Sequence, residues 1–217
     1  MASKRSYMMG KRAESQEETR RRIVEATMHL HEVLGPRNTT IMAIAERAGV
    51  QRLTVYRHFP TDVELFQACT SHWGALNPPP DPAPWMDIAD PVMRSVIALS
   101  ELYGYFCRTQ GMWRSSYRDV GEVPALQAPM ARFDAYLDGL ANMLAGAFPE
   151  SRRGRVSATL HHATRFQTWD TLEAQGLSDP MKAATVAAWL RGLVESDPVT
   201  APGQAAQAGT AAAAQGA

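Results

Sequence analysis

The 217-residue sequence contains few cysteines and no long apolar stretch. Its two cysteines, Cys69 and Cys107, are too few for a disulfide framework, which favours a reducing compartment such as the cytoplasm. No apolar run approaches the roughly 18 residues that a membrane-spanning helix needs. The basic N-terminus is not followed by the apolar core of a secretory signal. We therefore expect a cytoplasmic protein that does not bind a membrane.

The common signatures of enzymes are also missing. The sequence has no Gly-rich phosphate loop, no nucleophile elbow and no paired carboxylates with a suitable partner. Cys69 and His72 are spaced to share a helix face, but such a pair is usually structural rather than metal-binding. We expect a protein that is not an enzyme and that has no cofactor and no metal site.

Alternating β-branched runs, which would indicate strands, are absent, whereas 14 prolines separate segments of helical periodicity. This pattern predicts an all-α fold of about nine helices. Expected helices include 17–34, a segment from Pro91 that Gly111 ends near residue 110, a short helix over 113–120, and one helix over 151–175. The proline-rich run 78–84 is expected to be extended.

Residues 40–59 have the pattern of two short helices that meet at a glycine. Ile44, Ala45 and Ala48 recur at helical spacing, and Thr40 is positioned to cap the first helix. Gly49 follows where a left-handed cap residue is needed. Val55 would bury the second helix and leave its polar residues facing outward, which is the sequence form of a helix-turn-helix.

The distribution of charge agrees with a nucleic-acid-binding N-terminal region. Residues 1–60 contain 11 Lys and Arg against 6 Asp and Glu, whereas residues 61–217 contain 11 against 16. A basic module attached to an acidic body is what a polyanion-binding protein with a separate sensing or assembly domain shows. Ordinary scatter of charge is the alternative reading.

Three segments carry a family resemblance: Ile-Ala-Glu-Arg-Ala-Gly-Val (44–50), Thr-Val-Tyr-Arg-His-Phe-Pro (54–60) and Glu-Leu-Phe (64–66). From Arg21 to about Phe66, the sequence resembles the DNA-binding domain of the TetR family of transcriptional repressors. The resemblance implies a homeodomain-like three-helix head and a helical body for ligand binding and dimerisation. We expect a flexible basic arm (1–16), a helix-turn-helix domain (17–66), an effector-binding and dimerisation domain (67–196) and a disordered tail (197–217).

The second helix of the motif supplies the expected contacts with double-stranded DNA. The planar fork of Arg52 suits a guanine, Gln51 suits an adenine, and Thr54 suits a thymine methyl or a phosphate. The resemblance implies phosphate contacts for Tyr56 and His58. The full expected set is Thr40, Gln51, Arg52, Leu53, Thr54, Tyr56, Arg57 and His58.

Three positions depart from the family pattern. Gln51 stands where a serine-like cap is common, and Leu53 replaces a small residue and would project an apolar group towards the groove. Asp62 stands where a lysine frequently contacts phosphate. A small-molecule-binding protein that has lost DNA binding is therefore one open alternative.

The resemblance also implies a small-effector cavity in the body, although aromatic residues at helical spacing more often form a core. The expected lining is Tyr103, Phe106, Trp113, Tyr117, His162, Arg165, Phe166 and Trp169. Arg165 suits an anionic effector or, equally, a surface carboxylate. A constitutive DNA-binding regulator without an effector is the second alternative.

The last two helices resemble the family's dimerisation surface, which would place two reading helices on a palindromic operator. The expected interface is Leu160, Ala163, Leu172, Val186, Trp189, Leu190 and Leu193, although these residues would also serve to close the core of a monomer. The leading hypothesis is a homodimeric repressor that leaves its operator when an effector binds.

Overall fold

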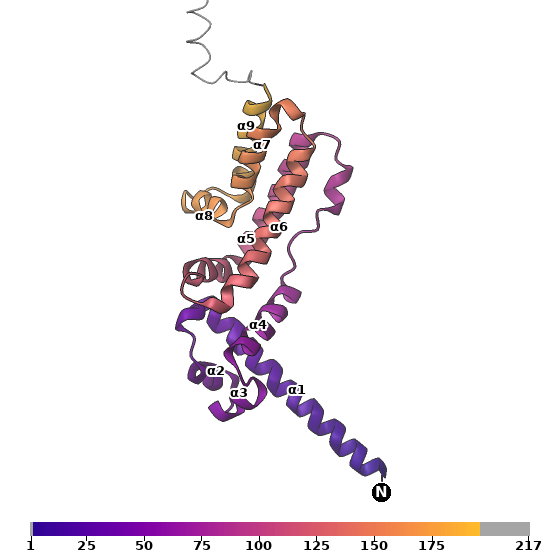
Figure 1. Cartoon of the computed structure of the whole chain (residues 1–217), viewed down its shortest axis with the longest axis vertical. Coiled ribbons are helices and arrows are strands. Elements are labelled where there is room, and N and C mark those ends of the chain that lie inside the picture. The colour runs from indigo at the N-terminus through magenta and orange to yellow at the C-terminus, as the bar shows by residue number, and fades with distance from the viewer. Residues whose placement is uncertain (1, 196–217) are drawn as a thin grey trace, which may run out of the picture. The chain divides into compact units, whose positions relative to one another are not determined.

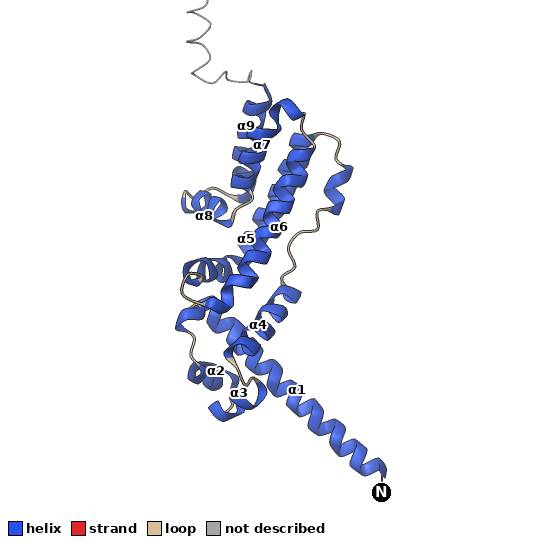
Figure 2. Cartoon of the chain, in the orientation of Figure 1, coloured by secondary structure: helices blue, strands red, loops and turns tan. Residues whose placement is uncertain are grey.

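The computed structural model describes residues 2–195, which form nine α-helices and two 3-10 helices and contain no strand (Figures 1 and 2). This confirms the predicted all-α class. None of these helices combines the length and the apolar character needed to cross a membrane, among the residues described. The elements are α1 (Ala2–Val33), η1 (Pro36–Asn38), α2 (Ile41–Ala48), α3 (Arg52–His58), α4 (Asp62–Leu76), η2 (Ala83–Asp87), α5 (Pro91–Asp119), α6 (Pro124–Gly146), α7 (Glu150–Ala163), α8 (Phe166–Ala174) and α9 (Asp179–Glu195).

The chain divides into two compact units, and α5 and α6 each contribute to both of them. Unit 1 comprises Met1–Asp81 and Glu101–Gly139, and unit 2 comprises Pro82–Ser100 and Leu140–Ala217. This division differs from the expected domain boundary at residues 66 and 67, because unit 1 combines the helix-turn-helix with parts of α5 and α6. The expected tail, 197–217, lies outside the described residues.

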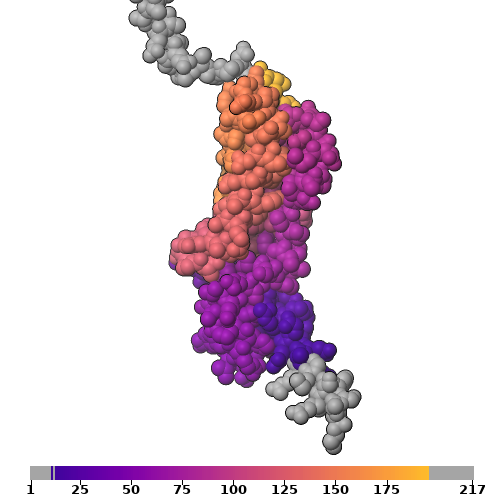
Figure 3. Space-filling view, turned by 45° about the vertical axis from the view of Figure 1, so that its right-hand side comes forward, coloured from indigo at the N-terminus to yellow at the C-terminus, as the bar shows by residue number. Residues whose placement is uncertain are grey.

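Unit 1 begins with a small head in which α1, α2 and α3 enclose an apolar core. Ile23, Ile44, Ala45 and Val55 are among its buried residues. The space-filling view shows α1 side chains directly against the head segments that follow them (Figure 3). Burial of this continuous cluster from all three helices stabilises the short helices, which would be marginal alone.

The predicted caps of the head are confirmed. The Thr40 side chain accepts a hydrogen bond from Ala43 N at 3.2 Å and starts α2. Gly49 ends α2 with φ 64° and ψ 41°, a left-handed conformation that costs glycine little. Thr61 and Glu64 form a reciprocal capping box at the start of α4.

Two expected helix boundaries in unit 1 are wrong. α1 begins at Ala2 and not near Glu17; the segment before residue 17 is rich in Lys, Arg, Glu and Met, which favour helix without apolar periodicity. α5 continues through Gly111 to Asp119. A Cβ at Gly111 would lie 2.9 Å from Glu32 Cγ, so this glycine permits close approach of α1 rather than ending a helix.

Two expectations in unit 2 are also corrected. The single helix expected over 151–175 is α7 and α8, because Arg165 has an extended backbone and the Thr168 hydroxyl bonds the carbonyl of His162 across the break. The proline-rich run is not extended throughout. Pro82 has φ −74° and ψ −12°, and η2 starts at Ala83.

The core of unit 2 forms where α7, α8 and α9 pack together. A buried lysine, Lys182, donates to Asp179 Oδ1 at 2.6 Å and also to Glu173, and its ammonium lies 5.1 Å from the Trp169 ring centroid. Burial alone would lower the pKa of Lys182, but the two carboxylates raise it above its usual value. The pairing satisfies the charge and ties α8 to α9.

Candidate nucleic-acid interface and ligand cavity

α3 presents one buried face to the head and one exposed face to solvent. Val55 is completely buried, whereas Leu53 is 78% exposed. Gln51, Arg52, Tyr56 and Arg57 are also exposed, and Thr54 and His58 are half-buried. The structure therefore brings the predicted α3 residues together on one surface, with Leu53 as its apolar member.

Arg52 and Tyr56 are held together one helical turn apart. Arg52 Nη2 donates to Tyr56 Oη at 3.2 Å, and the guanidinium carbon lies 5.5 Å from the ring centroid. The hydrogen bond to Tyr56 raises the pKa of Arg52. The contact restricts the rotamers of both side chains while the remaining guanidinium donors stay solvent-facing, which is suitable for a bidentate base contact.

His58 lies beside α1 rather than pointing away from the head. It lines two shallow hollows together with Arg20, and the Arg20 guanidinium carbon lies 4.7 Å from the Phe59 ring centroid. Partial burial, followed by the charges of Arg57 and Arg20, lowers the pKa of His58. The basic surface therefore includes Arg20, which was not among the predicted residues because it lies outside the helix-turn-helix motif.

The start of α2 provides a second group of hydrogen-bond donors that can bind an anion. The Thr40 hydroxyl oxygen accepts a hydrogen bond from Ala43 N. This bond does not use the hydroxyl hydrogen, which can therefore donate to a phosphate. The first amides of α2 add the positive end of a helix dipole. Met42 is 71% exposed beside them, so this edge also has an apolar contact surface.

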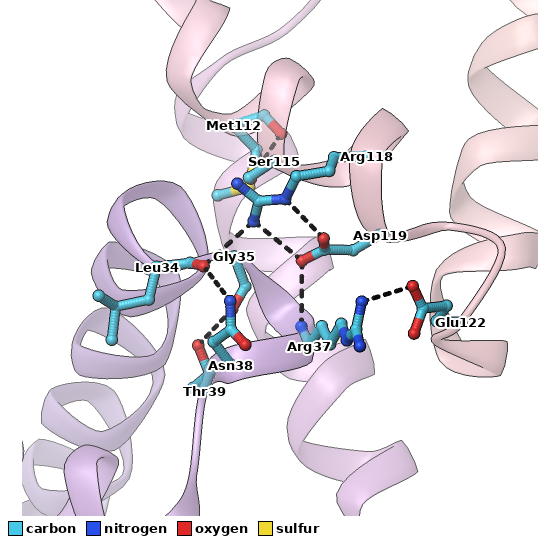
Figure 4. A network of polar contacts seen from close by, with 10 residues as sticks. All are labelled: Leu34, Gly35, Arg37, Asn38, Thr39, Met112, Ser115, Arg118, Asp119 and Glu122. Atoms are coloured by element: carbon cyan, nitrogen blue, oxygen red, sulfur yellow. Dashed lines mark hydrogen bonds and ion pairs between the residues drawn. The ribbon is translucent and has the colours of Figure 1, made fainter.

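A network of polar contacts joins the end of α1 to the end of α5 within unit 1 (Figure 4). Asp119 Oδ2 accepts from Arg37 N at 3.1 Å, and Arg118 Nη2 donates to Leu34 O at 3.1 Å. Arg118 Nε also donates to Asp119 Oδ1 at 2.7 Å. We call Gly35, Arg37, Arg118 and Asp119 the α1–α5 latch.

The latch has a conformational and an electrostatic requirement. Gly35 has φ 89°, and a Cβ at this position would collide with the Arg118 guanidinium and the Asp119 carboxylate. The hydrogen bond from Arg118 lowers the pKa of Asp119, despite the opposing effect of burial. The carboxylate is therefore ionised at neutral pH, and it accepts two charge-assisted hydrogen bonds from Arg118 and one from the backbone N–H of Arg37.

Unit 1 also contains a cavity of about 370 Å³ among the end of α1, η1, α4, α5 and α6. Its wall is mainly aromatic and apolar, with a few hydroxyl and amide groups. The aromatic members are His31, Phe66, Trp73, Tyr105, Trp113, Phe133 and Tyr136. A cavity of this size and character is typical of a small-molecule site.

The cavity lining differs from the expected effector lining, which stays a prediction. Of that set only Trp113 lines it. Tyr103 and Phe106 are fully buried, and Tyr117 donates to Asp134 Oδ1 at 3.0 Å. The other four belong to unit 2. They were grouped with the rest because periodicity identifies apolar faces but not the partners that those faces meet. These four are His162, Arg165, Phe166 and Trp169.

Most of the expected dimer interface lies inside the core of unit 2. Leu160, Ala163, Val186 and Leu190 are completely buried within the single chain, so they cannot contact a second copy without repacking. Leu172 and Leu193 are half-buried and Trp189 is 39% exposed. Met181 of α9 is 56% exposed.

The cavity members that come from different elements carry no shared signal in the sequence. His31, Trp73, Phe133 and Tyr136 are brought together from α1, α4 and α6. Each is an ordinary apolar or aromatic position in its own helix. Only the proline-rich stop after α4 and the short α5–α6 connection indicated that these helices fold back upon one another.

Known proteins are similar to this chain in both sequence and fold. The family model described as bacterial regulatory proteins, tetR family, matches residues 23–69. The HTH-type transcriptional regulator SrpR of Pseudomonas putida is 41% identical over 61 residues, which cover 28% of this chain and 29% of that protein. The sequence match therefore spans less than a third of that relative's length.

Three solved structures extend the likeness to the whole fold. A TetR-like transcriptional regulator from Rhodococcus sp. RHA1 has a TM-score of 0.61 at 20% identity, covering 82% of this chain and 97% of that one. A Clostridium perfringens putative fatty acid metabolism regulator has a TM-score of 0.56 at 12% identity, covering 82% and 100%. NalD of Pseudomonas aeruginosa, a secondary repressor of the MexAB-OprM multidrug efflux pump, has a TM-score of 0.50 at 20% identity, covering 83% and 96%.

Proposed function

We propose that this chain regulates transcription by binding double-stranded DNA. The proposal starts from its membership, through the N-terminal region, of the tetR family of bacterial regulatory proteins. The observation that carries this proposal is the exposed polar face of α3 on a capped helix-turn-helix. Arg52, Tyr56 and Arg57 supply donors for bases and phosphates. Arg20, beside His58, and Thr40, at the start of α2, supply further groups for contacts with the DNA backbone.

In our proposal the protein is a repressor that leaves its operator when a small effector occupies the cavity. The cavity includes His31 and Pro36 from the end of the head, and Ser116 from α5. Ser116 precedes Asp119 of the α1–α5 latch by less than one helical turn. A ligand that moves α5 therefore acts on the segment that precedes the helix-turn-helix. This arrangement favours the effector-controlled repressor over a constitutive regulator.

The proposed active form is a homodimer on a palindromic operator, because a single recognition helix provides little affinity. On α8 and α9, the apolar side chains with exposed surface include Trp189, Met181 and the half-buried Leu172 and Leu193. Trp189→Glu should shift the sedimentation of the protein towards the monomer. Met86→Glu, at an apolar residue of unit 2 that is 52% exposed, is the control.

DNA binding is tested by fluorescence anisotropy with DNA from upstream of the protein's own gene and with a shuffled sequence of equal composition. We expect preferential binding to the upstream fragment, with affinity falling steeply as salt rises because phosphate contacts release counterions. Equal affinity for both DNAs would refute sequence-specific regulation through this site. Specific binding that no ligand of the cavity reverses would instead support the constitutive alternative.

A further inference from the structure

The cavity of unit 1 has a size that limits its occupant. Its volume is about 370 Å³. An apolar cavity of about 150 Å³ holds benzene, so this cavity has room for roughly two or three fused rings. It lies near the lower end of the range for small-molecule sites, which favours small, compact ligands.

The rings around the cavity are already ordered by one another. Trp113 and Phe133 stack with centroids 3.9 Å apart at 20°, and Phe133 and Tyr136 lie 5.9 Å apart at 22°. Trp73 meets Trp113 edge-on at 5.3 Å and 90°. A flat ring entering the cavity therefore meets a wall that offers stacked and edge-to-face contacts, the two favourable geometries of aromatic pairs.

Two of these side chains, Trp113 and Tyr136, have their polar ends bonded within the protein. Tyr136 Oη donates to Pro80 O at 2.7 Å, and Trp113 Nε1 donates to Thr109 Oγ1 at 3.0 Å. These bonds fix the ring orientations and leave the hydrocarbon surfaces of the rings to meet a ligand. Recognition by ring faces requires an apolar, planar partner.

The cavity wall has little charge to offer. Among the described residues that line it, none is Asp or Glu, and Arg132 is exposed at its edge. Burial lowers the pKa of His31 to about 4, and burial raises the pKa of Cys69 to about 12, so both groups are neutral at pH 7. A buried ligand cation would lose its hydration without gaining a carboxylate, and an anion would find only a solvated guanidinium.

We propose that the cavity binds a flat, uncharged aromatic molecule of two or three fused rings. The proposal deepens the function proposed above, since it names the chemical class of the effector and rests on the cavity being the effector site. Shape selects a planar molecule through Trp73, Trp113 and Phe133. The neutral wall selects against its charged isosteres.

The ligand class is tested by calorimetric titration of the full-length protein at pH 8 with three isosteres. These are phenanthridine, its N-methylated cation and phenanthrene-9-carboxylate. We expect phenanthridine to bind and each charged isostere to bind at least about tenfold more weakly. Equal or tighter binding of either ion, or no binding of phenanthridine, would overturn the proposal.

A matched pair of glycine variants assigns the binding to this cavity. Gly74 lines the cavity on α4 and Gly139 lies on α6 outside its lining, and neither has a heavy atom within 4 Å of a Cβ at that position. Gly74→Trp should fill the entrance and weaken phenanthridine binding at least about tenfold, while Gly139→Trp should leave it unchanged. Equal effects of the two variants would place the ligand elsewhere.

Adding phenanthridine to the protein–DNA complex separates this proposal from the proposed function. Binding in the cavity without release of DNA would retain the ligand class and refute effector control. Release of DNA by phenanthrene-9-carboxylate but not by phenanthridine would retain effector control and overturn the ligand class. We expect release by phenanthridine and none from Gly74→Trp.

Discussion

The α3 surface and the cavity belong to the same unit but are built in opposite ways. The α3 surface is a run of nearly consecutive residues, exposed and attached to the head mainly through Val55. The cavity is assembled from residues between His31 and Tyr136 on five elements, and its wall is also part of the core. Substitutions on α3 should therefore alter binding alone, whereas those near the cavity should alter stability as well.

The largest stability effect is expected from acidification, through His31. Burial places its folded-state pKa at about 4, below the value of about 6.5 expected when unfolded. Between these values the unfolded state binds the additional proton, so stability falls as pH drops from 6.5 towards 4, by roughly 3 kcal/mol. Urea unfolding at several pH values measures this. His31→Phe, which removes the titrating group, should flatten the dependence; an unchanged slope would assign it to other groups.

A smaller loss is expected from Gly35→Ala in the α1–α5 latch. The added Cβ meets Arg118 and Asp119, and alanine is strained at φ 89°, so we expect a loss of about 2 kcal/mol in the free energy of unfolding. Gly121→Ala is the matched control, since Gly121 has no neighbour within 4 Å of a Cβ. If both variants unfold at the same urea concentration, the latch is not rigid.

Asp119→Asn should cost less, about 1 kcal/mol, because the amide keeps an acceptor for Arg37 N but loses the charge-assisted bonds to Arg118. The pKa of Asp119 is lowered in the folded state, so its contribution is present above the unfolded-state pKa and is lost as pH falls through the folded-state value. The unfolding curves of the wild type and of Asp119→Asn should therefore differ at neutral pH and converge at acidic pH. A difference that persists at acidic pH would contradict this account.

The contrast between the two regions also explains what was predictable. Thr40, Gly49 and the Thr61–Glu64 box were correctly placed because caps depend on a few neighbouring residues. Gly111 was misread as a helix end because its actual neighbour, Glu32, is 79 positions away in the sequence. The cavity lining differs from the expected set for the same reason, since contacts between helices leave no local periodicity.

The interface prediction shows a second limit. Leu160 and Val186 are apolar at the correct helical spacing, but spacing does not distinguish a face buried within the chain from one buried against a second copy. Whether unit 2 dimerises therefore stays a prediction, as does the cytoplasmic location. The reading of DNA by α3 is the part for which sequence pattern and exposed geometry agree.

The most direct test of that reading is the affinity of Arg52→Ala for the upstream DNA fragment, measured beside Arg155→Ala. Arg155 is an exposed arginine of α7, so both variants remove one positive charge. We predict that Arg52→Ala keeps the wild-type unfolding curve and weakens specific binding about 10- to 100-fold, while Arg155→Ala binds as the wild type does. Unchanged affinity and base preference for Arg52→Ala would contradict the assignment of α3 as the DNA-reading helix.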